Sequence, residues 1–428
     1  MTAKQSGKER KERKPSEQRI EPQAELSERD DAAIISRRAA ARLRAGHVWV
    51  YRSDLTALPE NPGNLLPVTD PRGTSLGTAL YSPTSEIALR LISREELPSE
   101  AEWLEVLAAR MRSAIAARQE ILANPETNAC RLIFSEADNL PGLIADKYAD
   151  ILVLQLLTKA LDNDAVRIVA TSVLKDALQP AIIVERPDAR IRELEQLSAP
   201  LDGPPLYVRD DLNLQTQFRL NGLNFHYDAS AGQKTGAFLD QRENYVAAAR
   251  HAHGDALDVC TYQGGFALHL ARACNRVTGI DVSRAALEVA EQNLAANRAT
   301  LRAEVDWVEA NAFDLLRDWS YSGVMYDTIV LDPPAFAKSK RAVEGALRGY
   351  KELNLRALKM LRPGGTLVTC SCSHHVSLAD FTAVVAAAAG DADRRVRLIE
   401  RRGAAADHPV ILTIPETEYL KCLICSVE

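Results

Sequence analysis

The segment ALDVCTYQGGFALHLARACNRVTGID, residues 256–281, constrains the fold of this chain more than any other stretch. A short apolar run at 256–260 is typical of a buried parallel strand. A turn over 261–265 and a helix over 266–273 follow it. A second apolar run, 276–280, ends on the carboxylate of Asp281. The pattern predicts a strand, turn, helix and strand of a parallel α/β sheet.

The turn and the terminal acid of this segment indicate which ligand it suits. An acid at the end of the second strand can accept both hydroxyls of a ribose, so Asp281 is a candidate nucleoside contact. A dinucleotide fingerprint would place glycines at Cys260 and Tyr262, whereas this turn keeps only Gly264, backed by Gly265. A pyrophosphate needs an open, glycine-lined helix N-terminus, and a nucleoside without phosphates does not. The turn therefore favours S-adenosylmethionine over NAD, and the alternative is a βαβ unit without a ligand.

Length, charge and cysteine content exclude several classes of protein. The chain has 428 residues, enough for two or three domains, and its net charge of -6 means that nucleic-acid contacts must come from local basic patches. No apolar run approaches the ~18 residues of a membrane span, and the polar N-terminus is no secretory signal. Seven cysteines in a chain of this size do not suggest a disulfide framework. We expect a cytoplasmic protein without a membrane partner.

Four segments of different composition follow one another. Residues 1–32 are rich in charged residues and serine, which predicts a disordered tail. Residues 33–98 carry short strand candidates between turns and predict a small β-rich domain. Residues 99–205 combine helical spacing at 100–124 with strand candidates and predict an α+β middle domain. Residues 206–428 contain the segment described above and predict an α/β domain.

The last domain supplies further strands for a seven-stranded sheet. Ser283 can cap a helix that runs to Arg298. The sequence LRPGG at 361–365 predicts a helix stop and a turn before the next strand. A closing antiparallel hairpin is typical of methyltransferase sheets and is absent from dinucleotide-binding ones. The strand candidates are 305–308, 326–331, 366–370, 395–401 and 418–427.

The strand at 326–331 ends in DPPAFAKSKR, which bears candidate site residues. Asp332 is the first polar residue at the C-terminal edge, where open α/β sheets bind ligands. Phe336 could stack on a base, and three basic residues are placed to meet phosphates, namely Lys338, Lys340 and Arg341. The alternative is a proline turn with a solvated basic loop.

The strand at 366–370 leads into TCSCSHH, with two cysteines. Alternation places Cys370 and Cys372 on the same side, and Cys372 lies further toward the edge where substrate is expected. Zinc binding together with His374 and His375 is one alternative, but methyl transfer needs no metal and we expect none. Buried packing thiols are the other alternative.

Several motifs together resemble one known family. GHVWVYRSDL at 46–55 and the pattern DxxGxxLGxALYxPxSxIALR at 70–90 resemble a PUA-type RNA-binding domain. The later motifs are GQKTGAFLDQR, DVCTYQGGF, DPPAFAKSK, TCSCS and DHPVILTIPETEYLK. Over nearly all residues after the tail, the chain resembles bacterial large-subunit ribosomal RNA cytosine-5 methyltransferases that begin with a PUA domain. The implied fold is a Rossmann-like, seven-stranded class I methyltransferase domain, preceded by a PUA-like domain and a small α+β domain.

The resemblance implies a reaction. Such an enzyme would methylate C5 of a cytosine in 23S ribosomal RNA through a transient bond between Cys372 and C6, with Asp332 near N3 of the base. Other RNA cytosine-5 enzymes carry a second cysteine after the prolines to help release product, and Ala335 stands there in this chain. The base that removes the C5 proton is unassigned. Two alternatives are a guanine N7 or N2 methyltransferase without an adduct, and a non-catalytic RNA-binding assembly factor.

The resemblance and the strand ends also assign binding residues. Lys234, Asp240 or Arg242 of the GQKTGAFLDQR motif would hold the methionine carboxylate or order the site, and Asn311 would meet the adenine amino group. The expected partner is 23S ribosomal RNA before the subunit is fully assembled, with a homodimer as a further expectation. The predicted cofactor contacts are Asp258, Tyr262, Gly264, Asp281, Asn311, Lys234 and Asp332. An arginine cluster predicted to touch RNA phosphates comprises Arg37, Arg38, Arg42 and Arg44.

Overall fold

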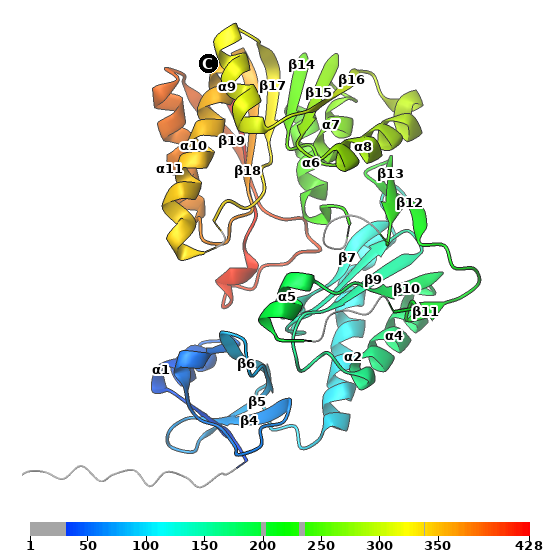
Figure 1. Cartoon of the computed structure of the whole chain (residues 1–428), viewed down its shortest axis with the longest axis vertical. Helices are drawn as coiled ribbons and strands as arrows, with labels where there is room; N and C mark the ends of the chain where they lie inside the picture. The colour runs from blue at the N-terminus through cyan, green and yellow to red at the C-terminus, as the bar shows by residue number, and fades with distance from the viewer. Residues whose placement is uncertain (1–30, 198–202, 231–235, 338) are drawn as a thin grey trace, which may run out of the picture.

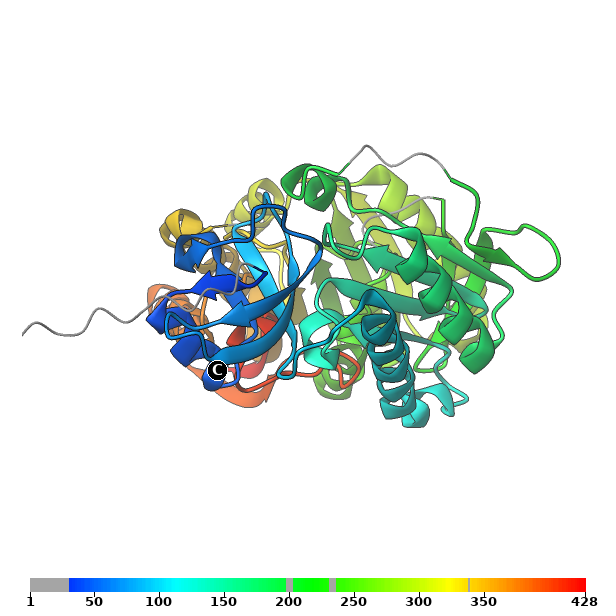
Figure 2. The same cartoon turned by 90° about the horizontal axis from the view of Figure 1, so that it is seen from below.

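Three sheets and a separate hairpin make up the computed structural model, which describes residues 31–197, 203–230, 236–337 and 339–428. The N-terminal sheet lies at the bottom of Figure 1, the middle sheet at the centre, and the largest sheet at the top. Seen from below, the first two units lie side by side under the third (Figure 2). This arrangement confirms the predicted order of β-rich, α+β and α/β parts. The predicted disordered tail lies outside the described residues except for its last two positions.

The N-terminal unit is a six-stranded sheet with one helix packed on it. Its strands lie in the order β2-β6-β5-β4-β1-β3, and only β1 and β4 are parallel neighbours. Ser36 begins the helix because its side chain accepts a hydrogen bond from the Ala39 backbone N–H at 3.1 Å. The elements are β1 (Ala33–Ile35), α1 (Arg37–Arg44), β2 (Trp49–Tyr51), η1 (Arg52–Asp54), β3 (Leu55–Ala57), β4 (Leu65–Thr69), β5 (Ser75–Tyr81) and β6 (Ile87–Ser93).

The middle unit is a five-stranded sheet in the order β11-β10-β9-β8-β7, packed against two long helices. The helix predicted over 100–124 is interrupted at Arg118, whose buried guanidinium binds the carboxylate of Asp138 through two hydrogen bonds of 2.7 and 2.8 Å. The elements are α2 (Glu100–Ala117), α3 (Gln119–Leu122), β7 (Ala129–Phe134), η2 (Ser135–Asp138), β8 (Leu143–Tyr148), β9 (Ile151–Leu156), α4 (Asp164–Leu178), β10 (Ile182–Glu185), α5 (Ala189–Leu194) and β11 (Tyr207–Val208).

The last unit contains the predicted seven-stranded sheet, in the order β16-β15-β14-β17-β18-β20-β19. A hairpin precedes it and turns at Asn221 and Gly222, both with positive φ. The first elements are β12 (Gln215–Leu220), β13 (Leu223–Asp228), η3 (Leu239–Gln241), α6 (Arg242–His251), β14 (Asp255–Val259), α7 (Gly265–Leu270) and β15 (Arg276–Asp281). The others are α8 (Arg284–Asn297), η4 (Arg298–Thr300), β16 (Glu304–Glu309), α9 (Ala312–Ser322), β17 (Tyr326–Leu331), η5 (Lys340–Ala342), α10 (Val343–Met360), β18 (Leu361–Ser371), α11 (Leu378–Asp391), β19 (Val396–Arg402), η6 (Pro415–Thr417) and β20 (Lys421–Val427).

The structure corrects one local prediction. LRPGG was expected to form a turn before the fifth strand, but β18 already begins at Leu361, which pairs with Tyr326. The register then shifts, so that several residues of β18 lie opposite Asp327. A bulge of this kind accommodates the proline and two glycines within a strand.

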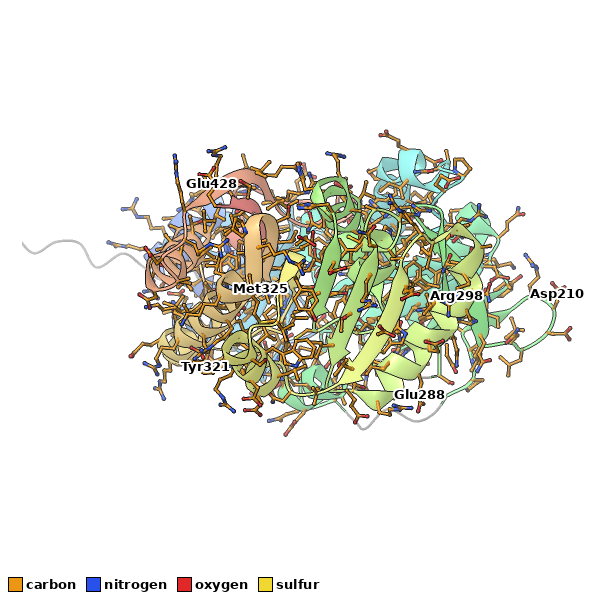
Figure 3. The ribbon with its side chains drawn as sticks, turned by 90° about the horizontal axis from the view of Figure 1, so that it is seen from above. Asp210, Glu288, Arg298, Tyr321, Met325 and Glu428 are labelled. Carbon is orange, nitrogen blue, oxygen red and sulfur yellow. The ribbon has the colours of Figure 1, made fainter. Side chains whose placement is uncertain are left out.

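The position of the C-terminus shows where the parallel strands of the sheet begin and where they end. Glu428 directly follows β20 and lies at the top of the molecule, where the view from above also shows Met325, just before β17 (Figure 3). Because β20 is antiparallel to β18, the parallel strands begin near this top face and end below it. Their carboxyl ends, where α/β sheets bind ligands, therefore face the N-terminal and middle units.

A long loop connects the three units. Residues 403–420, here called the junction loop, leave the sheet after β19 and run down between the other two units (red in Figure 1). In this loop, Glu416 lies 3.2 Å from Nε2 of His47 in the N-terminal unit. The backbone carbonyl of Asp407 accepts a hydrogen bond of 2.9 Å from Arg118 of the middle unit. The junction loop thus fixes both units beneath the carboxyl ends of the sheet.

Candidate active site

The turn after β14 keeps an unusual backbone. Cys260, Tyr262 and Gly264 have φ values of 64°, 51° and 84°, all in the left-handed region. For the two residues with a Cβ atom this conformation costs roughly 1–2 kcal/mol each. The backbone therefore follows the path that a glycine-rich fingerprint would take, although two of the glycines are missing. Such local strain is most often found at binding sites.

Beneath this turn lies a cleft with aromatic walls. It holds about 430 Å³ of empty space, a volume that includes open solvent at its mouth. Asp332 and the backbone of the turn contribute its polar groups. Its aromatic lining comprises Phe218, Phe225, Phe238, Tyr245, Tyr262 and Phe266.

Two carboxylates on this side fit a nucleoside cofactor. Asp281 accepts backbone hydrogen bonds of 2.9 Å from Tyr262 and from Ser283, one at each oxygen, which leaves further lone pairs for ribose hydroxyls. Asp258 is fully buried, accepts hydrogen bonds from Thr261 and Ala267, and burial raises its pKa to about 7. Its Oδ1 atom has no partner within the described ranges.

We expect Asp281→Ala to weaken binding of S-adenosylmethionine by about 10- to 100-fold, because the ribose hydroxyls of the cofactor would lose the predicted acceptor of their hydrogen bonds. Isothermal titration calorimetry with the cofactor measures this change. Glu309→Ala is the matched control, since Glu309 pairs with Asp281 in register at the end of β16 and is half-exposed. An unchanged dissociation constant for Asp281→Ala would show that the cofactor does not use this carboxylate.

The other predicted cofactor residues differ in their surroundings. Tyr262 and Gly264 lie in the turn itself. Asn311 caps α9, and its Oδ1 accepts hydrogen bonds from Phe313 at 2.9 Å and Asp314 at 3.4 Å. Its oxygen is thus occupied, and its amide group is the part that could donate to a ligand. The predicted contact at Lys234 lies outside the described residues.

The structure distinguishes the two cysteines of β18. Cys370 is fully buried and lies opposite Cys422 of β20, whose thiol, together with burial, raises the pKa of Cys370 well above its usual range. Cys372 follows the end of β18 and is only partly buried. Its Sγ atom lies 3.9 Å from the carbonyl oxygen of Pro333. Cys372 therefore borders the loop that begins with Asp332.

Asp332 lies in a setting that favours its protonated form. Burial, followed by the negative charges of Asp240 and Asp258, raises the pKa of Asp332 to about 8. Gln241 donates a hydrogen bond of 3.0 Å to Oδ1 of Asp332, and Asn244 in turn donates one of 2.7 Å to Gln241. At neutral pH, Asp332 can therefore give a proton to a group in the cleft.

Two neighbours of Cys372 were not singled out from the sequence. They are Tyr419, at the end of the junction loop, and Lys421, the first residue of β20. Lys421 donates hydrogen bonds of 2.7 Å to the carbonyl oxygens of Ser373 and Tyr419. Burial lowers the pKa of Lys421 to about 8, and the charge of Cys372 opposes this shift. The ring of His374 stacks on Tyr419 at 5.3 Å between centroids. These groups meet because Ser371 pairs with Lys421 in register, a contact that local sequence does not reveal.

The predicted arginine cluster is largely engaged within its own unit. Arg38 and Arg42 form ion pairs with Asp54 at 2.8 and 3.3 Å, and Arg44 pairs with Asp70 at 2.5 Å. Arg37 is exposed on α1. A role in binding RNA phosphates stays a prediction for all four arginines.

The predicted RNA contacts on the loop after β17 are partly described. Phe336 packs against Tyr350 at 4.7 Å and Phe313 at 5.8 Å between ring centroids. Lys340 and Arg341 are exposed in η5. The position of Lys338 lies outside the described residues.

Comparison with known proteins agrees with this site. Residues 201–414 match a family described as S-adenosylmethionine-dependent methyltransferase, and residues 33–94 match a PUA-like domain. A methyltransferase crystallised with SAH has a TM-score of 0.77 at 18% identity, covering 92% of this chain and 99% of its own. An S-adenosylmethionine-dependent methyltransferase from Streptococcus mutans gives a TM-score of 0.76 at 18% identity, with the same coverage. These matches confirm the predicted fold class and the cofactor, S-adenosylmethionine.

Two relatives identify the family. The chain is 37% identical over 390 residues to a protein from Pseudoalteromonas translucida and 35% identical over 404 residues to one from Photobacterium profundum. Both relatives are named ribosomal RNA large subunit methyltransferase I, and each match covers 90% of this chain and 96% of the relative. The described residues contain no helix long and apolar enough to cross a membrane. The chain therefore belongs to the ribosomal RNA large subunit methyltransferase I family of S-adenosylmethionine-dependent methyltransferases.

Proposed function

We propose that this protein methylates C5 of a cytosine in 23S ribosomal RNA through a transient bond between the sulfur of Cys372 and C6 of the base. One observation carries the proposal. Sγ of Cys372 lies 3.9 Å from the carbonyl oxygen of Pro333, the residue that follows Asp332. The two candidate catalytic groups, 40 residues apart in sequence, thus border one position at the carboxyl edge of the sheet.

The groups at this position have the chemistry that the reaction needs. C5 of cytosine is a poor nucleophile, and addition of a thiolate to C6 makes C5 able to attack a methyl group. Asp332, with its pKa of about 8, can give its proton to N3 and so neutralise the charge that develops on the ring. The ammonium group of Lys421 favours the thiolate form of Cys372. S-adenosylmethionine, held by Asp281 and the turn at Tyr262–Gly264, supplies the methyl group.

The position of Cys372 argues against a guanine N7 or N2 methyltransferase, which requires no thiol beside its substrate. A partly buried cysteine at the carboxyl edge, next to a protonated acid and a buried lysine, is an arrangement that nucleophilic catalysis uses. A non-catalytic assembly factor would need no reactive cysteine beside an acid and a lysine.

The proposal also covers the RNA substrate, the cellular compartment, the oligomeric state and the domain boundaries. The names of the relatives point to large-subunit ribosomal RNA. Because the base must leave its stack to reach Cys372, RNA that is not yet enclosed in an assembled subunit is the substrate we propose. We propose that the enzyme acts in the cytoplasm, as a monomer or homodimer, with domain boundaries at residues 33–98, 99–205 and 206–428.

Mapping of modified nucleotides tests the proposal. We expect 23S ribosomal RNA from cells without the gene to lack the C5 methyl group of one cytosine, as measured by mass spectrometry of RNA fragments. A plasmid copy of the wild-type gene should restore this modification, and a copy encoding Cys372→Ala should not. Loss of a methyl group from a guanine instead would support the guanine alternative.

A further inference from the structure

The proposed reaction leaves one step without a residue, which is removal of the C5 proton before the sulfur departs. Ala335 occupies the position where other RNA cytosine-5 enzymes carry a second cysteine, and its side chain cannot accept a proton. The base must reach the space between Asp332 and Cys372. It must also have an oxygen or nitrogen atom that is not already committed to another hydrogen bond.

Among the residues that the structure describes, Asp240 meets both conditions. Its Oδ2 atom accepts a hydrogen bond of 2.5 Å from the hydroxyl of Tyr419, whereas its Oδ1 atom receives none from the described residues. The side chain is partly exposed. The carboxylate is therefore held in one orientation and keeps one oxygen available.

The surroundings of Asp240 place it between the two catalytic groups. On one side, the adjacent residue Gln241 binds Asp332, and the charge of Asp240 raises the pKa of that acid. On the other side, the ring of Tyr419 stacks on His374, and burial, followed by the charge of Asp240, raises the pKa of Tyr419 well above its usual range. Asp240 is thus one residue from the partner of the acid and one hydrogen bond from the tyrosine that stacks on His374, close to the nucleophile.

Other acidic and basic groups nearby are committed to other contacts. Asp281 holds the backbone after β14 and β15, and its remaining lone pairs are assigned to the cofactor ribose; Asp258 lies fully buried under the turn. Lys421 donates to two carbonyl groups, and Asp332 serves as the acid. This leaves Asp240 as the carboxylate with an available oxygen at the site.

We propose that Asp240 is the base that removes the C5 proton, with Tyr419 as a positioning residue; this rests on the proposed function. The C5–H bond breaks and its proton passes to Oδ1 of Asp240. The electron pair of that bond forms the C5=C6 double bond, the C6–S bond breaks, and the sulfur leaves as the thiolate of Cys372. The hydroxyl of Tyr419 keeps the carboxylate oriented throughout.

The full-length Asp240→Asn variant tests this assignment. Incubated with S-adenosylmethionine and a 23S ribosomal RNA transcript, it should accumulate a methylated, covalent protein–RNA complex at least about tenfold above wild type, while turnover falls about 100-fold. Denaturing gel electrophoresis with a labelled methyl group measures both quantities. Asp210→Asn, at an exposed position far from the site (Figure 3), is the matched control and should behave as wild type.

Three additional measurements decide between the outcomes. Asp240→Asn combined with Cys372→Ala should give no complex, and Tyr419→Phe should slow release by about tenfold. If Asp240→Asn binds the cofactor more weakly and forms no complex, Asp240 is a cofactor contact and the assignment is overturned.

A transcript containing 5-fluorocytidine, which has no C5 proton to lose, should trap the wild-type enzyme. Failure of that trap would refute the proposed adduct chemistry itself, and success of the trap without accumulation in Asp240→Asn would refute only the assignment of the base.

Discussion

Replacement of Cys372 by alanine should abolish methyl transfer, with a fall in rate of at least about 10³-fold. Without the sulfur, nothing in the site can add to C6, and C5 stays too weak a nucleophile to attack a sulfonium methyl group. Cofactor binding should not change, because Asp281 and the turn that carries Tyr262 belong to other strands. Transfer of a labelled methyl group to a 23S ribosomal RNA transcript measures the rate, and calorimetry measures cofactor binding.

Cys370→Ala is the matched control for this experiment. Cys370 has the same side chain and lies two residues earlier, within β18, but it is fully buried against Cys422. Its replacement should cost about 1 kcal/mol of stability and leave the rate within a few-fold of wild type. Full activity in Cys372→Ala would exclude the cysteine adduct and favour methylation of guanine.

Local sequence signals were sufficient to predict the sheet. The apolar runs at 256–260 and 276–280 and the Ser283 cap all have the structures that their patterns indicated. Each of these signals acts within a few residues, so its physical cause is contained in the stretch that shows it. The exception was LRPGG, where a bulge opposite Asp327 places a proline within a strand.

Contacts between distant residues could not be predicted in the same way. Tyr419 lies 179 positions from Asp240, and Lys421 reaches Cys372 only through the antiparallel pairing of β20 with β18. The arginine cluster shows the same limit, because sequence gives the charge of Arg38 and not its ion pair with Asp54. The sequence thus predicted that Asp332 and Cys372 lie at strand ends. It did not predict that Lys421 and Tyr419 lie beside Cys372.

A cluster of buried charges around Asp407 in the junction loop joins the middle unit to the last unit. Asp407 is fully buried, and its Oδ2 atom accepts hydrogen bonds from the backbone N–H of Arg131 at 2.8 Å and from Arg242 at 3.2 Å. His408 lies 3.2 Å from its other oxygen. Arg242 belongs to the GQKTGAFLDQR motif, and its ion pair with Asp407 ties that motif to the junction loop. Its predicted role, holding the methionine carboxylate or ordering the site, stays a prediction.

Asp407→Asn should destabilise the protein by about 3–5 kcal/mol at pH 7, because the variant removes the buried carboxylate beside the guanidinium of Arg242 and leaves only the half-exposed Glu243 as its acidic partner. Urea unfolding followed by tryptophan fluorescence measures this difference. Asp164→Asn is the matched control, since the side chain of Asp164 is almost fully exposed, and it should change stability by less than about 0.5 kcal/mol.

The dependence on pH separates this charge effect from a simple packing defect. Burial alone would raise the pKa of Asp407, but the hydrogen bond and charge of His408 and the charge of Arg242 outweigh it and hold the pKa at about 2, against 3.8 for an ordinary aspartate. A carboxyl with a lowered pKa stabilises the folded state above its unfolded pKa, and that contribution is lost as the pH falls toward the folded pKa. The difference in stability between wild type and Asp407→Asn should therefore be constant from pH 7 to about 5 and shrink by about 2.5 kcal/mol between about pH 5 and pH 1. A difference that stays the same down to pH 2 would mean that Asp407 joins the middle unit to the last unit by its shape and not by its charge.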